Sequence, residues 1–472
     1  MIDVQKSRLF VEPGRILLHI AIWSVLSILF TAIIIQYSFN YGRLTLPCSY
    51  DDVSYFLQGA HKLRIFYEGG IIAILRDYFH RPLHSPFSIW LSACCFAIFG
   101  IHDWAPYLGN AFIIFVFLGC VDYLLGDLAL RWKILWLIFT LTFPFSAMIV
   151  HEFRPDLANG LLVGMGIVLF TTRPFLSSNL SRHFPGLLCF AAAFVTKPSV
   201  LPFTLLMFTT TLCGVAICER WLLADPSCFL SIVAHIGKRF AVLFLWVLPY
   251  HGFHLPYHLK YTFRNLVINR DLWAYHGADR WMLYLKGYAG QVMLGRHVYL
   301  ISAVLVVGGL LHLLYCKKEQ TVRIGILTGM TFLSWGIVTA NAQTQFTGAI
   351  FYFLLFFETV IILRNLLQND QKNPFPQSLL FSGMIALTLA GLMNVQLPPK
   401  IGERTSPQTK AVNRIVRDVF LTITSRTEEN ATVYFTTIGY LTPTLFEYLM
   451  LRSRFETNNR TLPSGEGLGV GS

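Results

Sequence analysis

The chain has 472 residues, of which 54% are hydrophobic and only 13% are charged, and its mean hydropathy is +0.55. A soluble core cannot hide that much apolar surface, so the composition excludes a soluble globular protein and predicts a polytopic membrane protein. The formal charge of +12 does not indicate nucleic-acid binding, because the basic residues stand between apolar segments, where they fit membrane orientation and anionic lipid or phosphate chemistry.

The N-terminal segment predicts how the chain enters the membrane. Lys6, Arg8 and Arg15 precede an apolar segment, 16–37, that is too long for the core of a signal peptide. Basic residues favour the cytoplasmic side. We therefore expect this segment to stay in the membrane, with the N-terminus in the cytoplasm. The nine cysteines lie mostly in or beside apolar segments without ligand spacing, so they predict neither a disulfide framework nor a zinc site.

Two adjacent carboxylates, Asp51 and Asp52, follow the first span and should lie on the outer side. Desolvated acids beside a membrane are costly unless water, cations or a substrate meet them, so the pair is a candidate functional site. The alternative is that Asp51 only caps the helix that begins near Asp52. A cap needs one carboxylate, and the sequence has two.

The next segments place further charges on the same side. Segment 86–101 is shorter than the roughly 20 residues of a span, so we expect a helix on or dipping into the outer interface. Segments 107–125 and 132–150 are long enough to cross, with Arg131 and Lys133 between them on the inside. Arg154 and Asp156 then share the outer side with the acidic pair.

The same alternation predicts about eleven crossings in all, with the N-terminus inside and the C-terminus outside. It places Lys197 and the polar loop 255–297 outside, and an amphipathic segment, 226–236, on the cytoplasmic side. The remaining predicted spans are Leu157–Phe170, Phe184–Thr196, Val200–Ile217, Phe240–His254, Val298–Tyr315, Ile324–Ala340, Ala349–Leu363 and Gln377–Met393.

The predicted fold is an all-α polytopic membrane protein with outer juxtamembrane helices. Residues 1–395 form the membrane domain and residues 396–472 an outer C-terminal region. In that region the pattern predicts a helix over 411–423, a strand over 432–438 and a helix over 445–451, hence a small α/β tail. No internal repeat is visible, which counts against the repeat-built transporter folds.

Cations gather on the outer side, where few are expected: Arg81, His84, Arg154, Lys197, Arg270 and Arg280. An anionic lipid phosphate is the obvious ligand. Snorkelling to outer headgroups is the alternative for any one of them, and it explains Lys197 poorly because that residue stands in a short hairpin between two apolar segments. Carboxylates beside such cations suggest group transfer, in which a base accepts a proton from an acceptor hydroxyl while cations stabilise a phosphate leaving group.

Five motifs follow one another in a familiar order: the acidic pair, then His80–Phe87, Phe99–Ala105, Arg154–Asp156 and Val195–Pro198. This order resembles the GT-C superfamily of membrane glycosyltransferases. Within it, the chain is similar to the family that groups protein mannosyltransferases with lipid A aminoarabinose transferases. The resemblance covers about residues 16–215.

The resemblance implies a GT-C-like bundle, a polyprenyl-phosphate sugar donor, inversion at the anomeric carbon and attack by a hydroxyl of a lipid, glycan or protein acceptor. It implies that Asp51 is the catalytic acid, Asp52 its neighbour and Asp156 the second acid. Lys197, with Arg81 or His84, falls where family members contact the donor phosphate. Ser85 stands in place of a family proline, which leaves open which of those two takes the role, and Ser54 stands where some relatives have Arg.

We therefore predict a hexosyl- or pentosyltransferase of the cell envelope, multi-pass in the cell membrane, with its active site on the extracytoplasmic side, periplasmic or lumenal. A transporter or flippase of a lipid-linked sugar is the alternative, although it would line a path with polar residues and the spans hold few. An inactive scaffold is a third reading, against which the intact Asp51 and Asp156 count. A divalent cation, Mg²⁺ or Mn²⁺, held by those two acids stays open. The expected partners are the donor, the acceptor and membrane lipids, without nucleic acid.

Overall fold

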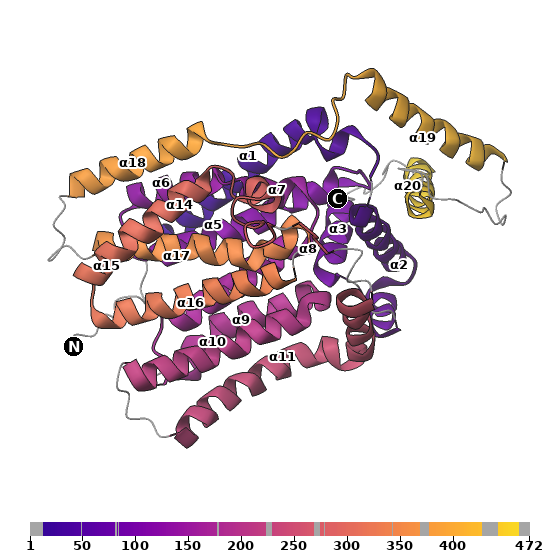
Figure 1. The fold of residues 1–472 in the computed structure, drawn as a ribbon. Helices are drawn as coiled ribbons and strands as arrows, with labels where there is room; N and C mark the ends of the chain where they lie inside the picture. Colours follow the sequence, from indigo (N-terminus) through magenta and orange to yellow (C-terminus); the bar gives the residue numbers. More distant parts are fainter. Residues whose placement is uncertain are drawn as a thin grey trace, which may run out of the picture.

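The computed structural model describes residues 13–48, 50–80, 83, 85–176, 179–222, 229–268, 274–277, 279–341, 343–368, 377–426 and 442–461. Over these ranges the protein is helical and contains no strand. The helices that run along the bundle are α1 (Pro13–Tyr41), α5 (Ala111–Leu125), α6 (Leu130–Leu141), α7 (Pro144–His151), α8 (Pro155–Thr171), α9 (Leu180–Thr196), α10 (Leu201–Leu222), α11 (Phe229–Phe263), α14 (His297–Ala303), α15 (Gly309–Tyr315), α16 (Lys318–Ala340), α17 (Ala349–Gln368) and α18 (Gln377–Met393) (Figure 1).

The protein is a polytopic all-α membrane protein. Seven helical segments of the described chain are long and apolar enough to cross a membrane, or eight if α6 and α7, which meet at a 63° bend, form one span. The shorter apolar helices α8 and α9 and the apolar part of α18 lie alongside them (Figure 1). Each predicted span has a helical counterpart, and the number of crossings stays a prediction.

Helix α8 lies in the middle of the bundle, between α9 and α17. Its small residues permit that close packing. A Cβ added at Gly160 would lie 2.7 Å from Ala349 of α17, and one at Gly166 would lie 2.8 Å from the ring of Phe190 of α9. This packing holds the first turn of α8, which carries Asp156, at one end of the bundle.

A second layer covers that end of the bundle, at the right of Figure 1. It contains α2 (Tyr50–His80), which bends at Gly70 with a φ of +65°, and α3 (Pro86–Phe99), with which α2 packs. The other helices outside the bundle are α4 (Ala105–Gly109), α13 (Tyr288–Met293), α19 (Pro407–Arg426) and α20 (Pro443–Thr461).

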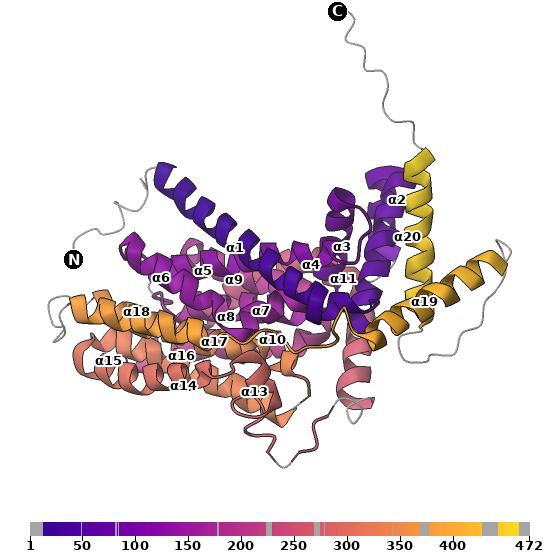
Figure 2. The same cartoon turned by 90° about the horizontal axis from the view of Figure 1, so that it is seen from above.

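The C-terminal helix α20 lies beside α2 in both views (Figures 1 and 2). Tyr448 of α20 packs its ring 6.2 Å from that of Phe56 and donates a hydrogen bond of 2.9 Å to Asp103. Arg452 reaches the same carboxylate at 3.1 Å. The C-terminal region is thus joined to the layer that carries the acidic pair.

The structure corrects one boundary and extends two others. The amphipathic segment 226–236 and the span 240–254, predicted as separate, are parts of one helix, α11, over their described residues. The charge at Arg239 does not end the span, because its side chain is buried and donates to the carbonyl oxygens of His235 and Phe175. The two predicted tail helices exist and are longer, as α19 and α20, whereas the predicted strand 432–438 lies outside the described residues.

Candidate active site

Four segments meet at this end of the bundle to form a cluster of charges. They are the turn after α1, which carries Arg43; the first turn of α2, with Asp51 and Asp52; the link from α7 into α8; and Lys197, the residue that follows α9. Acids in the first turns of α2 and α8 suit the positive end of the helix dipole. The chain order alone does not bring these segments together; the packing of the helices does.

Asp51 forms the most exposed of the carboxylate–cation pairs in the cluster. Arg154, in the link before α8, donates a hydrogen bond to the Asp51 carboxylate. The Asp51 side chain is 57% exposed and that of Arg154 only 17%. The guanidinium also lies over the Phe346 ring, 5.4 Å from its centroid. Asp51 is thus a solvent-facing carboxylate that is held by a largely buried cation, which places it where a substrate hydroxyl could reach it.

Lys197 forms the second ion pair, with Asp156, to which its ammonium donates a hydrogen bond. The position follows from the local sequence: a residue before proline is restricted to extended conformations, so the helix α9 ends at Thr196. Lys197 accordingly has φ −140° and ψ 87°. Its side chain is 18% exposed and that of Asp156 is 14% exposed.

Asp52, unlike its neighbour, is inside the protein, with 1% of its surface exposed. Its Oδ2 accepts a hydrogen bond of 2.6 Å from the hydroxyl of Tyr107, while its Oδ1 is buried without a hydrogen-bond partner in the described structure. Burial raises the pKa of Asp52 to about 6, against the opposing effect of Arg43. The buried Asp52 side chain can support the site but does not face the space where an acceptor substrate could bind.

Glu152 links the two arginines of the cluster. It accepts hydrogen bonds from Arg43 Nε at 3.1 Å and from Arg43 Nη2 at 2.6 Å. The bidentate form is the strong geometry for such a pair. Its Oε2 also lies 4.0 Å from Arg154 Nε. Charges therefore alternate along the series Asp51, Arg154, Glu152 and Arg43.

The sequence reasoning did not predict Arg43, Glu152 or Tyr107 as members of the site. Glu152 had a usable signal, since it stands two residues before Arg154 in a polar link between apolar helices. Arg43 stands in the turn that leads to the acidic pair, but nothing in its local pattern distinguishes it from a cation at an interface. Tyr107 lies within an apolar segment, and only the packing places its hydroxyl against Asp52.

The burial of Asp52 predicts a pH-dependent stability. Its folded pKa of about 6 lies above the ordinary value of 3.8, so its neutral form stabilises the fold below pH 4, and this contribution is lost as the pH rises through 6. We expect the wild type to lose about 1 to 3 kcal/mol from this group between pH 4 and pH 7.5, and Asp52→Asn to lack that loss. Chemical unfolding in detergent at both pH values measures it. An identical pH dependence in the two proteins would contradict it.

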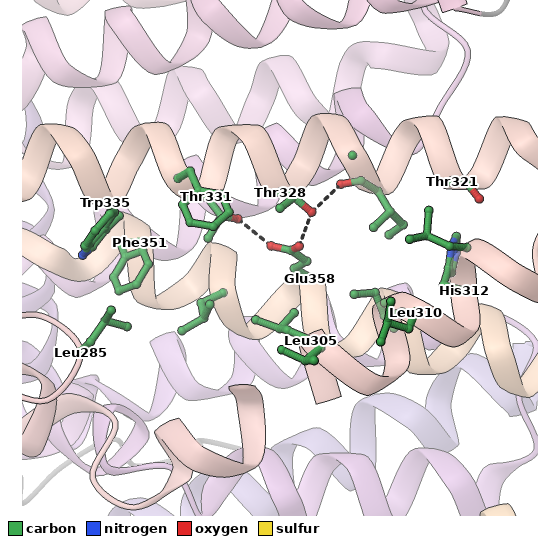
Figure 3. Close-up of a pocket in the computed structure, with 18 residues that line it drawn as sticks. Leu285, Leu305, Leu310, His312, Thr321, Thr328, Thr331, Trp335, Phe351 and Glu358 are labelled. Carbon is green, nitrogen blue, oxygen red and sulfur yellow. Dashed lines mark hydrogen bonds between the residues drawn. The ribbon is translucent and has the colours of Figure 1, made fainter. Parts of the chain in front are cut away.

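A cavity of about 290 Å³ opens beside the second ion pair. Asp156 and Lys197 line it at one place, Phe203, Ile337 and Ile350 supply apolar walls, and Asn341 adds an amide. An apolar cavity with a few convergent polar groups is the usual form of a ligand site. A larger cavity, of about 680 Å³, lies elsewhere, among α15, α16 and α17 (Figure 3).

Four residues besides Lys197 are predicted to bind the donor phosphate. Arg81, His84 and Arg270 lie outside the described residues. Arg280 is described and exposed, with its guanidinium 5.9 Å from the centroid of the Trp281 ring, and it forms no ion pair with Asp51 or Asp156.

The predicted metal site has no further support in the geometry. Within the ranges that the structure describes, no group of three or more His, Cys, Asp or Glu side chains could hold a metal ion. Asp51 and Asp156 each bind a cation of the protein instead. The divalent cation stays a prediction.

Comparison with known proteins gives a weak likeness. No family model and no curated protein matches the sequence. Among solved structures, the chain is similar to ArnT from Cupriavidus metallidurans bound to undecaprenyl phosphate, with 13% identity over 95% of this chain and 76% of that one and a TM-score of 0.48. The same protein in the apo state gives 12% identity over 92% and 75%, with a TM-score of 0.47. A likeness of this size establishes neither a common fold nor a common activity.

Proposed function

We propose that the protein is a GT-C-like membrane glycosyltransferase that moves a sugar from a polyprenyl-phosphate donor to an acceptor hydroxyl at the extracytoplasmic face. One observation carries the proposal: two carboxylate–cation pairs lie together at one end of the bundle, and one of them borders an apolar cavity. A lipid phosphate needs both a cation and an apolar wall. The order of sequence motifs described above supports the same chemistry.

The donor would be held by two parts of the cavity. Its phosphate meets the Lys197 ammonium, a charge-assisted contact, and the first part of its chain lies against Phe203, Ile337 and Ile350. The cavity volume of about 290 Å³ is too small for a whole polyprenyl chain, so the rest continues into the bilayer. The sugar then projects toward Asp51, which is the exposed carboxylate.

The transfer step follows from these positions. The acceptor oxygen attacks the anomeric carbon. The bond between that carbon and the phosphate oxygen breaks, and the polyprenyl phosphate leaves with the electron pair. Asp51 accepts the proton of the acceptor hydroxyl, and Lys197 stabilises the charge on the departing phosphate. Attack from the face opposite the phosphate inverts the anomeric configuration.

Donor binding also changes the partners of the acids. In the structure Arg154 is held by Asp51 and Lys197 by Asp156. A phosphate that takes over these cations releases the carboxylates, and a carboxylate that has lost its cation binds a proton more readily. The base is therefore activated when the donor is in place. If a Mg²⁺ or Mn²⁺ ion is bound, Asp51 and Asp156 are the residues that would hold it, and it would supply positive charge for the departing phosphate.

A transporter of the same lipid has less support. Such a protein needs polar groups along the whole path, whereas the two ion pairs and Asn341 lie at one end of the bundle. A further cavity of about 410 Å³, between α3, α5, α8 and α9, has an almost wholly apolar lining.

The test is turnover by the purified protein in nanodiscs with a panel of polyprenyl-phosphate hexoses and pentoses. We expect loss of the sugar from one donor and release of polyprenyl phosphate, with the Asp51→Asn variant as the inactive control. Movement of an intact lipid-linked sugar across proteoliposomes, without release of polyprenyl phosphate from any donor, would favour the transporter and contradict the proposal.

The proposed side of the membrane predicts a labelling pattern. Single cysteines at Glu68 and Thr405, both exposed near the outer end, should react with a membrane-impermeant thiol reagent in intact cells, in a cysteine-free background. A cysteine at Lys318, which is exposed at the start of α16, should react only after permeabilisation. Labelling of position 318 in intact cells, together with protection of positions 68 and 405, would contradict the proposed orientation and indicate the opposite one.

A further inference from the structure

A cavity among α15, α16 and α17 (Figure 3) is separate from the charge cluster, because Asp51, Asp156 and Lys197 do not line it. Its volume is about 680 Å³, within the range of small-molecule sites. Its walls come from three consecutive membrane segments: α14 to α15, α16 and α17. They are mainly aliphatic and aromatic, and no Lys or Arg is among the described residues that line the cavity.

One carboxylate points into this apolar space. Glu358 is 3% exposed and stands near the middle of α17, about 14 Å from its start at 1.5 Å per residue. Thr328 donates to its Oε1 and Thr331 to its Oε2, the latter at 2.8 Å (Figure 3). An ionisable residue at this depth marks a functional site by default, because burying it is costly.

The threonines do not saturate Glu358. Each hydroxyl has a single proton, and each also lies 3.0 Å from a carbonyl of its own helix, Ile324 for Thr328 and Leu327 for Thr331. The proton of each can serve only one of its two acceptors at a time. A carboxyl group has about four acceptor positions, so it keeps capacity for a donor from a ligand.

Other polar side chains line the same cavity, namely His312, Thr321 and Trp335. The indole Nε1 of Trp335 is buried without a hydrogen-bond partner in the described structure. Trp335 stands one helical turn from Thr331, a rise of about 6 Å. The cavity therefore presents an acceptor at Glu358, and Trp335 lines it one turn beyond Thr331 on α16.

The depth and the charges exclude an ionic headgroup. The phosphate of a bilayer lipid stays near the interface, roughly 15 Å from the midplane, and the lining offers it no cation. A neutral lipid can place its polar groups at the midplane. Val306, Leu310 and Leu313 line the cavity and are 63%, 57% and 62% exposed, so its mouth faces the hydrocarbon and a lipid can enter laterally.

We propose that this cavity is a binding site for a neutral glycerolipid with a free hydroxyl, that is, a diacylglycerol. The hydroxyl hydrogen-bonds to Glu358, and the ester groups lie toward the Trp335 end of the cavity. The acyl chains lie on the apolar walls and leave past Leu310 into the bilayer. The site is separate from the charge cluster, and it stands or fails independently of the proposed sugar transfer.

The test is photolabelling in nanodiscs with a diazirine-bearing diacylglycerol, followed by peptide mapping. We expect labelling of α16 and α17 that excess 1,2-dioleoylglycerol suppresses and that trioleoylglycerol, which has no hydroxyl, and dioleoylphosphatidylglycerol, which is anionic, do not. Glu358→Leu and the cavity-filling Leu310→Trp should each lower the labelling about five-fold or more. Leu29→Trp, on α1 and likewise 57% exposed, is the matched control and should not.

Four results would overturn the proposal. Equal suppression by trioleoylglycerol, or undiminished labelling of Glu358→Leu, would mean that the cavity holds only an acyl chain. Suppression by dioleoylphosphatidylglycerol would mean that the headgroup is not neutral. Leu310→Trp leaves Glu358 and its threonines intact, so undiminished labelling in this variant would place the lipid elsewhere even if Glu358→Leu does not fold.

Discussion

Asp51→Asn should lower turnover by about 10²-fold or more while the protein still folds and binds the donor. The amide keeps the size of the side chain and can still accept a hydrogen bond from Arg154, but it cannot take the proton of the acceptor hydroxyl. Turnover measured beside donor binding, both in nanodiscs, separates these effects. Glu68→Gln is the matched control, because Glu68 is an exposed acid on the same helix with an arginine, Arg64, 3.7 Å away.

Asp52→Asn should cost less activity than Asp51→Asn, since the Asp52 side chain is buried against Tyr107. If Asp51 only caps α2, asparagine would serve as well as aspartate. A near-normal rate for Asp51→Asn would then remove the residue from the catalytic machinery. Equal losses in both variants would assign the effect to the cluster as a whole.

Lys197→Ala should slow transfer by about one to two orders of magnitude. The substitution removes a charge-assisted contact to the leaving phosphate, worth roughly 1.5 to 3 kcal/mol. Lys197→Arg should recover only part of the rate, because a planar guanidinium does not replace a compact ammonium. Steady-state kinetics with varied donor concentration measure both variants.

The control for this variant must break a similar ion pair elsewhere. Lys133 lies 3.0 Å from Asp122 between α5 and α6 and is 12% exposed, close to the 18% of Lys197. Lys133→Ala should change stability without a specific effect on the donor. Full activity of Lys197→Ala would mean that this lysine only snorkels, and equal losses in the two variants would assign the effect to folding.

Several features of the site could be predicted from the sequence because they depend on local pattern. Hydropathy predicts where the spans lie, and the alternation of cations predicts which loops share a side. The motif order led to Asp51, Asp156 and Lys197, and the structure places all three in one cluster with Arg154. Lys197 in particular follows from its place before a proline.

The different environments of Asp51 and Asp52 could not be predicted in this way. Adjacent residues in the first turn of a helix point about 100° apart, and only the neighbours of α2 decide which of them is buried. Tyr107 comes from a distant segment, and the turn that carries Arg43 has no local pattern that distinguishes it from a cation at an interface. The continuity of α11 past Arg239 was missed for the same reason, since its hydrogen-bond acceptors lie partly on another segment.

The sequence by itself determined that this chain is a helical membrane protein and that acids and cations share one face, because hydrophobicity and charge act through local composition. Only the tertiary structure decided which acid meets which cation, since ion pairing depends on distances between segments as far apart as Asp51 and Arg154. It also decided that Glu358, one acid within an apolar segment, faces a cavity shared by three membrane segments. Packing, which no local pattern encodes, makes that space.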